Sequence, residues 1–138
     1  MSAEQRTYVI VGGGLAGAKA AETLRSEGFD GRVVLVAEER ELPYERPPLS
    51  KDYLQGKSER EAARVHDEGF YEANRIELLM GRRALALDPT GHAIELDGGE
   101  RLGYERMLLA TGAEPRRLEI PGAELAGIRY LRTLPDSD

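Results

Sequence analysis

Cysteine is absent from this 138-residue chain, and histidine occurs only twice, as His66 and His92. The absence of cysteine excludes disulfide scaffolds, Cys-ligated zinc, thiol nucleophiles and a redox-active CxxC pair within these residues. Two histidines far apart in the sequence do not make a His-rich metal site, so no metal ligands are expected. Both histidines are expected to be surface or structural residues.

Basic charge and long apolar runs are also scarce. Lys and Arg total 19 against 25 Asp and Glu, whereas a nucleic-acid-binding surface needs clustered excess base. No apolar run approaches the roughly 18 residues of a membrane span, and the first eight residues lack the apolar stretch of a signal peptide. With 41% hydrophobic residues the chain can form a core. These features predict one soluble, cytoplasmic domain over residues 1–138, without nucleic-acid or membrane partners.

Two short apolar runs flank a helical pattern near the start of the chain. Tyr8–Val11 and Arg32–Ala37 are rich in β-branched residues, which is typical of buried parallel strands. Leu15–Arg25 lies between them, is rich in Ala, Leu and Glu, and predicts a helix that ends before Gly28. Strand, helix and strand within about 30 residues indicate a right-handed βαβ unit.

The rest of the chain predicts further strands and a small antiparallel sheet. The expected elements are an ordered loop over 38–55 with a short helix at 51–54, a helix at 67–74, strands at 76–80 and 107–110, a β-meander over 85–104, and a last strand near 128–131. The predicted fold class is therefore α/β, with a Rossmann-like parallel sheet and a small antiparallel β-meander.

Gly12, Gly14 and Gly17 form a G-x-G-x-x-G motif between the first strand and the helix. In a dinucleotide site the first glycine permits the tight turn, the second lets the backbone approach a pyrophosphate, and the third lets the helix pack on the strand. The helix N-terminus then supplies N–H groups to the diphosphate. Glu38 ends the second strand and is placed to accept hydrogen bonds from free ribose hydroxyls, which favours FAD or NAD over NADP. The alternatives are a glycine turn without a ligand and a solvated Glu38.

A proline-containing loop, P-Y-E-R-P-P-L-S-K over residues 43–51, follows the second strand. Its two consecutive prolines predict a stiff, extended backbone from which Arg46 and Lys51 project. Two fixed cations beside a dinucleotide fold suit an anionic cofactor, although a rigid solvated loop has the same composition. Tyr44 is expected either to touch a flavin or to pack within the loop.

Four segments resemble the flavoprotein reductases that pass electrons to ferredoxins and rubredoxins. This family includes the reductase components of bacterial oxygenases and cytochrome P450 systems, with apoptosis-inducing factor as a distant relative. The matching segments span residues 9–17, 43–51, 109–112 and 130–134, so the resemblance covers nearly the whole chain. The loop string is far more specific than the glycine motif.

The resemblance implies an FAD-binding, NADH-using oxidoreductase with a ferredoxin- or rubredoxin-type acceptor. The residues that it implies for FAD are Gly12, Gly14, Ala16, Gly17, Glu38, Arg46, Lys51, Ala84, Thr111, Gly112 and Arg132. The glycine motif and Ala16 would hold the pyrophosphate, Glu38 the adenosine ribose, and the backbone of Ala84 the adenine end. Lys51 is the implied catalytic group, because a cation near the isoalloxazine edge stabilises the negative charge of reduction.

Two features of the family are not found in these 138 residues: a second G-x-G-x-x-G for NADH, and the later segment that returns to the flavin. The chain is therefore expected to be a truncated N-terminal FAD-binding domain that is inactive alone, binds FAD weakly or not at all, and self-associates. Two alternative functions remain open: an isolated non-catalytic module that binds FAD or an adenine dinucleotide, and an NAD-binding Rossmann domain of a dehydrogenase, which the loop string disfavours.

The arginine pairs Arg82-Arg83 and Arg116-Arg117 either recruit an acidic iron–sulfur partner or are scattered solvated charge.

Overall fold

The structure is a computed structural model that describes residues 6–138, and these residues form two compact units. The first unit comprises residues 6–44 and 65–111, and the second comprises residues 45–64 and 112–138. Among the described residues no helix is long and apolar enough to cross a membrane.

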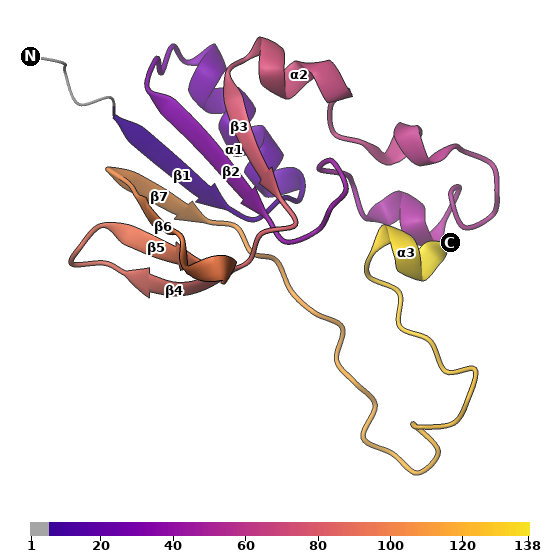
Figure 1. Ribbon diagram of the computed structural model, residues 1–138. Coiled ribbons are helices and arrows are strands. Elements are labelled where there is room, and N and C mark those ends of the chain that lie inside the picture. Colours follow the sequence, from indigo (N-terminus) through magenta and orange to yellow (C-terminus); the bar gives the residue numbers. More distant parts are fainter. Residues whose placement is uncertain (1–5) are drawn as a thin grey trace, which may run out of the picture. The chain divides into compact units, whose positions relative to one another are not determined.

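A four-stranded parallel sheet forms the centre of the first unit (Figure 1). Its strands, in spatial order, are β3 (Ile76–Met80), β2 (Arg32–Ala37), β1 (Thr7–Val11) and β7 (Arg106–Leu109). Val9 of the central strand β1 pairs with Val34 on one side and with Met107 on the other. Because all four strands run in the same direction, their carboxyl ends meet at one edge, and ligands of such sheets bind at that edge.

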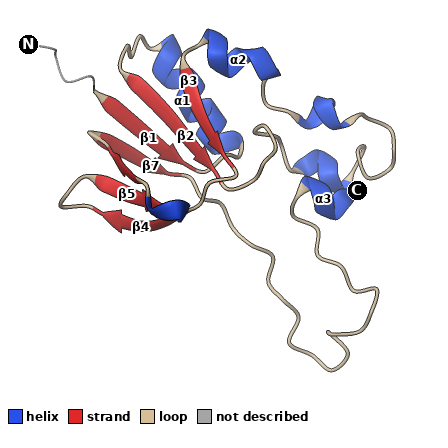
Figure 2. Cartoon of the chain, viewed as in Figure 1, coloured by secondary structure: helices blue, strands red, loops and turns tan. Residues whose placement is uncertain are grey.

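The parallel sheet is covered on both faces (Figure 2). One face carries the helices α1 (Leu15–Ser26) and α2 (Glu68–Ala73), and the other carries an antiparallel sheet of β4 (Ala84–Asp88), β5 (Ala93–Leu96) and β6 (Arg101–Gly103). Val9 and Val11 pack with Ile94 of the antiparallel sheet, whereas Ile10 packs with Ala21 of α1. Since side chains alternate along a strand, the continuous apolar run of β1 serves two cores at once.

The second unit contains only short helical segments. These are the 3₁₀ turns η1 (Pro47–Ser50) and η2 (Arg60–Ala63) and the helix α3 (Leu134–Ser137). Leu49 of η1 and Leu134 of α3 are buried, and the Ser137 hydroxyl donates a hydrogen bond to the Leu49 carbonyl at 2.8 Å. These contacts join the two segments of chain that make up the unit.

The elements predicted for the first unit are confirmed. The strands expected at 8–11, 32–37, 76–80 and 107–110 correspond to β1, β2, β3 and β7, and the helices expected at 15–25 and 67–74 correspond to α1 and α2. The predicted meander is the sheet β4-β5-β6, whose second turn contains the 3₁₀ segment η3 (Asp97–Gly99). The predicted α/β class with a parallel sheet and an antiparallel meander is thus correct.

Three predictions for the second unit are wrong. Residues 128–131 form no strand, and the short helix expected at 51–54 is replaced by η1, which begins at Pro47. The consecutive prolines are not extended, because a proline φ near −65° also suits a 3₁₀ turn, and the Leu49 N–H donates to the Arg46 carbonyl at 3.0 Å. The helix α3 was not predicted, although a Thr133–Asp136 capping box begins it.

Arg25, at the end of α1, joins three parts of the first unit. Its guanidinium donates hydrogen bonds of 2.6–2.8 Å to the backbone carbonyls of Phe29, Gly31, Asn74 and Arg75. The first two carbonyls precede β2, and the last two lie between α2 and β3. One side chain therefore satisfies carbonyls that helix and sheet geometry leave without a backbone partner.

We expect Arg25→Met to lower the free energy of unfolding by about 2–4 kcal/mol, since hydrogen bonds to a charged group contribute about 1.5–3 kcal/mol each and water replaces only some of them. Urea denaturation measures this value. Lys19→Met is the control, because Lys19 makes a single exposed ion pair with Glu22, and such pairs contribute about 0–1 kcal/mol. Equal effects of the two substitutions would contradict the role given to Arg25.

Candidate functional site

The glycine-rich loop after β1 is fixed by close backbone contacts within the first unit. Gly12 has a φ of +130°, and its N–H donates to the Val36 carbonyl at 2.8 Å. A Cβ on Gly12 would lie 1.9 Å from the Ala110 carbonyl oxygen and 3.1 Å from the Thr111 nitrogen. A Cβ on Gly17 would lie 1.9 Å from the Gly12 carbonyl oxygen. Neither glycine can carry a side chain, and the predicted Thr111 lies beside the loop.

Gly14 has a different environment. It precedes α1 as its N-cap with a φ of −92°, which any residue can adopt, and a Cβ there would have no atom within 4 Å. Among the described residues no side chain caps α1, and its first turn contains no acidic residue. The N–H groups of this turn have no partners inside the helix, so they are available to a ligand in the open space. This donor set, at the positive end of the helix dipole, suits a phosphate.

Glu38 directly follows β2 and is exposed, which fits both a ribose ligand and a solvated residue. Its carboxylate accepts a hydrogen bond from Nη1 of Arg83 at 3.1 Å. Arg83 reaches it because the chain after β3 runs beside the end of β2, with the Gly81 N–H donating to the Glu39 carbonyl at 3.1 Å. Ala84, the residue predicted for the adenine end, follows Arg83 and begins β4. Sequence reasoning missed the ion pair between Glu38 and Arg83.

The second unit brings together three further predicted residues, Arg46, Gly112 and Arg132. Nη1 of Arg46 donates a hydrogen bond to the Arg132 carbonyl at 2.6 Å. Gly112 has a φ of +73°, and a Cβ on it would lie 3.1 Å from Nη2 of Arg132. Both arginines are half-buried. The Arg46 guanidinium is thus held at the Arg132 backbone, and the Arg132 guanidinium lies near Gly112. Each of these guanidinium groups suits an anionic ligand.

Lys51 does not belong to this cluster of contacts. It is exposed at the end of η1, and within residues 6–138 its ammonium makes no hydrogen bond or ion pair. Tyr44 is 3% exposed, and its hydroxyl donates to the Glu39 carboxylate, so it is a packed loop residue of the first unit.

Each arginine pair includes a residue that contacts other groups of the chain. Arg82 donates to the carboxylates of Asp97 at 3.0 Å and Glu100 at 2.9 Å, and this guanidinium lowers the pKa of Asp97. The Arg117 guanidinium lies 4.3 Å from the centre of the Tyr130 ring, which is a cation–π contact. These two arginines are therefore engaged by neighbouring side chains.

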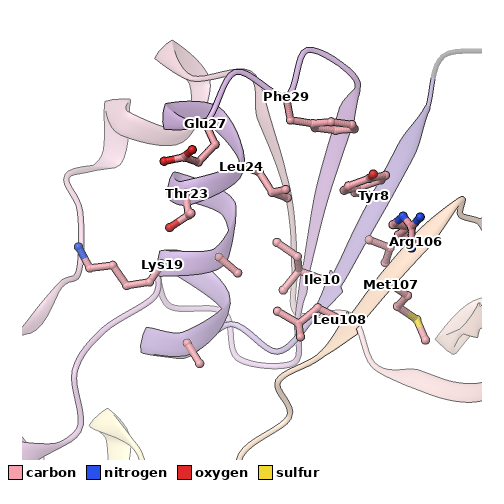
Figure 3. A pocket seen from close by; sticks show the side chains of 13 residues that line it. Tyr8, Ile10, Lys19, Thr23, Leu24, Glu27, Phe29, Arg106, Met107 and Leu108 are labelled. Carbon is pink, nitrogen blue, oxygen red and sulfur yellow. The ribbon is translucent and has the colours of Figure 1, made fainter.

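An apolar groove of about 590 Å³ lies on the helical face of the first unit, between α1 and the strands β1 and β7 (Figure 3). Ile10, Leu24, Phe29 and Leu108 line it, and the charged groups of Lys19 and Glu27 on α1 are directed away from the strands. Of the predicted cofactor residues only Ala16 contacts it. The groove is therefore distinct from the glycine-rich loop at the carboxyl ends of the strands. Within residues 6–138 no three His, Asp or Glu side chains converge as a metal site requires.

The sequence profile of the pyridine nucleotide-disulphide oxidoreductase family matches residues 6–138. The chain belongs to this family. Rhodocoxin reductase of Rhodococcus erythropolis is 41% identical to it over 132 residues, or 96% of the chain and 31% of that relative. The ferredoxin–NAD(+) reductase component of the Paraburkholderia xenovorans biphenyl dioxygenase system is 42% identical over 131 residues, or 95% of the chain and 32% of that relative.

Solved structures of family members share the fold. Putidaredoxin reductase, in its covalent complex with putidaredoxin, superposes with a TM-score of 0.91 at 39% identity over 99% of the chain and 33% of that structure. A ferredoxin reductase of Rhodopseudomonas palustris superposes with a TM-score of 0.89 at 39% identity over 95% of the chain and 32% of that structure. The chain spans about a third of the length of the relatives that it matches.

Proposed function

We propose that this family member is the FAD-binding part of an oxidoreductase that passes electrons from NADH through FAD to a ferredoxin- or rubredoxin-type acceptor. The observation that carries the proposal is the open space at Gly14, in front of an uncapped helix N-terminus. The names of the relatives support the direction of electron flow, since they are reductases of ferredoxins and rubredoxins. Because NADH is a cytoplasmic reductant, the cytoplasm is the proposed location.

The first unit would hold the adenosine diphosphate half of FAD. Backbone N–H groups at Gly14, Ala16 and Gly17 face the pyrophosphate in this proposal, since no side chain fills the space in front of them. Gly12 and Thr111 shape the loop by their close approach. The Glu38 carboxylate, which repels a 2′-phosphate, accepts hydrogen bonds from the ribose hydroxyls. Ala84 would contact the adenine end through its backbone.

The second unit would contribute to the flavin half. When bound, FAD would supply the redox chemistry, which is hydride acceptance and single-electron release. The guanidinium groups of Arg46 and Arg132 and the backbone of Gly112 would contact the flavin half of the cofactor. Lys51 has no competing carboxylate partner within the described residues, so its ammonium is available to stabilise negative charge at the flavin edge.

An FAD titration of the purified protein, followed by flavin fluorescence and absorption, tests this proposal. We expect FAD to bind and ADP to compete with it, because the phosphate loop recognises the ADP half. Riboflavin, which lacks that half, should not displace FAD. Absence of FAD binding, or displacement by riboflavin but not by ADP, would show that the proposal is wrong.

Replacing Glu38 by alanine should weaken FAD binding by roughly 1.5–3 kcal/mol, the usual contribution of a hydrogen bond to a charged group. The substitution also releases Arg83, whose guanidinium now bonds to Glu38. Discrimination between AMP and 2′,5′-ADP, which differ only in the 2′-phosphate, should therefore move toward 2′,5′-ADP. Glu105→Ala is the control, because Glu105 is an exposed acidic residue that directly precedes β7, whereas Glu38 follows the carboxyl end of β2. Unchanged affinities in Glu38→Ala would make Glu38 a solvated residue.

A further inference from the structure

The Arg132 peptide is fixed from both sides within the second unit. Its N–H donates to Oδ2 of Asp136 at 2.9 Å, and its carbonyl accepts from Nη1 of Arg46 at 2.6 Å. The same Asp136 oxygen accepts the N–H of Thr133 at 2.7 Å. One exposed carboxylate thus accepts from two successive backbone donors directly beside a predicted flavin-binding arginine.

Asp136 is itself held in place. It is the third residue of α3, and the Thr133–Asp136 capping box fixes it to the start of the helix. Leu134, two residues before it, is buried. The hydroxyl of Ser137, the next residue, donates a hydrogen bond to the Leu49 carbonyl. The N–H donors of Thr133 and Arg132 lower the pKa of Asp136, so the carboxylate is charged at neutral pH.

We propose that Asp136 is a positioning residue for the flavin half of the site: it fixes the Arg132 peptide, whose carbonyl in turn orients the Arg46 guanidinium. This inference rests on the proposed FAD function. The geometry carries it, because Asp136 and Arg46 contact the two ends of the residue whose guanidinium lies near Gly112. Asp136 would act on the cofactor only through the two arginines.

The test compares FAD affinity in Asp136→Ala, Asp136→Glu, Arg132→Ala and the double variant Arg132→Ala/Asp136→Ala. Asp136→Ala should weaken FAD binding by about two- to thirtyfold, the range spanned by loss of one capping side chain. Asp136→Glu should restore most of this loss, since glutamate also serves at the third position of a capping box. The double variant should lose less affinity than the sum of the two single losses, because the effect of Asp136 that runs through the Arg132 side chain is already lost in Arg132→Ala, whereas the effect that runs through the Arg132 carbonyl to Arg46 remains.

Asp138→Ala is the matched control. Asp138 lies on the same terminal segment, and its carboxylate contacts the Tyr53 hydroxyl and Nη2 of Arg60 at 3.4 Å instead of the Arg132 peptide. We expect Asp138→Ala to bind FAD like the wild type. Wild-type affinity in Asp136→Ala, equal losses in Asp136→Ala and Asp138→Ala, or fully additive losses in the double variant would overturn the proposal.

Amide hydrogen exchange without FAD separates this inference from the proposed function. The Arg132 and Thr133 amides should exchange faster in Asp136→Ala than in the wild type and Asp138→Ala, while the amides of β1 and β2 remain protected. If the wild type binds no FAD, the proposed function is wrong, and the exchange rates alone decide whether Asp136 fixes the Arg132 peptide. Unchanged exchange at these two amides would reject the positioning role.

Discussion

Replacing Gly14 by valine should abolish FAD binding and leave the fold intact. The open space at Gly14 allows the side chain to enter without a clash, and the φ of −92° is accessible to valine. The isopropyl group would then stand between the N–H groups of α1 and the pyrophosphate. Because hydrogen bonds to a charged group contribute about 1.5–3 kcal/mol each, losing two of them weakens FAD binding by more than about a hundredfold. Flavin fluorescence titration measures this change.

The fold should tolerate valine at Gly14 but not at Gly17. Valine is a poorer N-cap than glycine, which costs about 0.5–1 kcal/mol, whereas a Cβ on Gly17 would lie 1.9 Å from the Gly12 carbonyl oxygen and 3.1 Å from Leu35 Cδ1. We expect Gly17→Val to lower the free energy of unfolding by at least about 3 kcal/mol. Normal FAD affinity in Gly14→Val would place the phosphate site elsewhere, and a stable Gly17→Val would contradict the close helix–strand packing.

The first unit could be predicted from sequence because its local signals agree with its long-range contacts. The run Val33–Val36 is apolar on both faces, as a central parallel strand requires, and Gly12 and Gly17 mark the turn and the helix contact. The second unit lacks such agreement. Pro47 and Pro48 are compatible with both an extended chain and a 3₁₀ turn, and the bond from Leu49 to the Arg46 carbonyl decides between them.

The candidate site also contains some features that the sequence could predict and others that it could not. The roles proposed for Gly12 and Gly17 follow from their spacing. A Cβ on either glycine would lie 1.9 Å from a backbone carbonyl oxygen, which explains why neither can carry a side chain. The ion pair between Glu38 and Arg83 could not be predicted, because it joins residues 45 apart in sequence and depends on β3 lying next to β2. The helix-capping role of Asp136 could have been predicted from the sequence, since Thr133 and Asp136 have the spacing of a capping box.

A polypeptide of these 138 residues alone should bind FAD weakly and show no NADH-dependent turnover. Catalysis requires a nicotinamide held against the flavin ring, whereas the chain contains one G-x-G-x-x-G motif, which we assign to FAD. Its length is about a third of that of the related reductases. Leu108 and Leu109 on the edge strand β7 are 45% and 58% exposed, so self-association is also expected.

This prediction separates an enzyme from a nucleotide-binding module. The 138-residue protein is mixed with FAD, NADH and ferricyanide, and NADH oxidation is compared with that of free FAD at the same concentration. We expect equal rates with wild type, Gly14→Val and no protein, because binding the ADP half of FAD does not position NADH. Light scattering should show a mass above that of a 15.2 kDa monomer. Turnover above the free-flavin rate that disappears in Gly14→Val would contradict this prediction. It would mean that these residues form a complete active site and bind the nicotinamide without a second glycine motif.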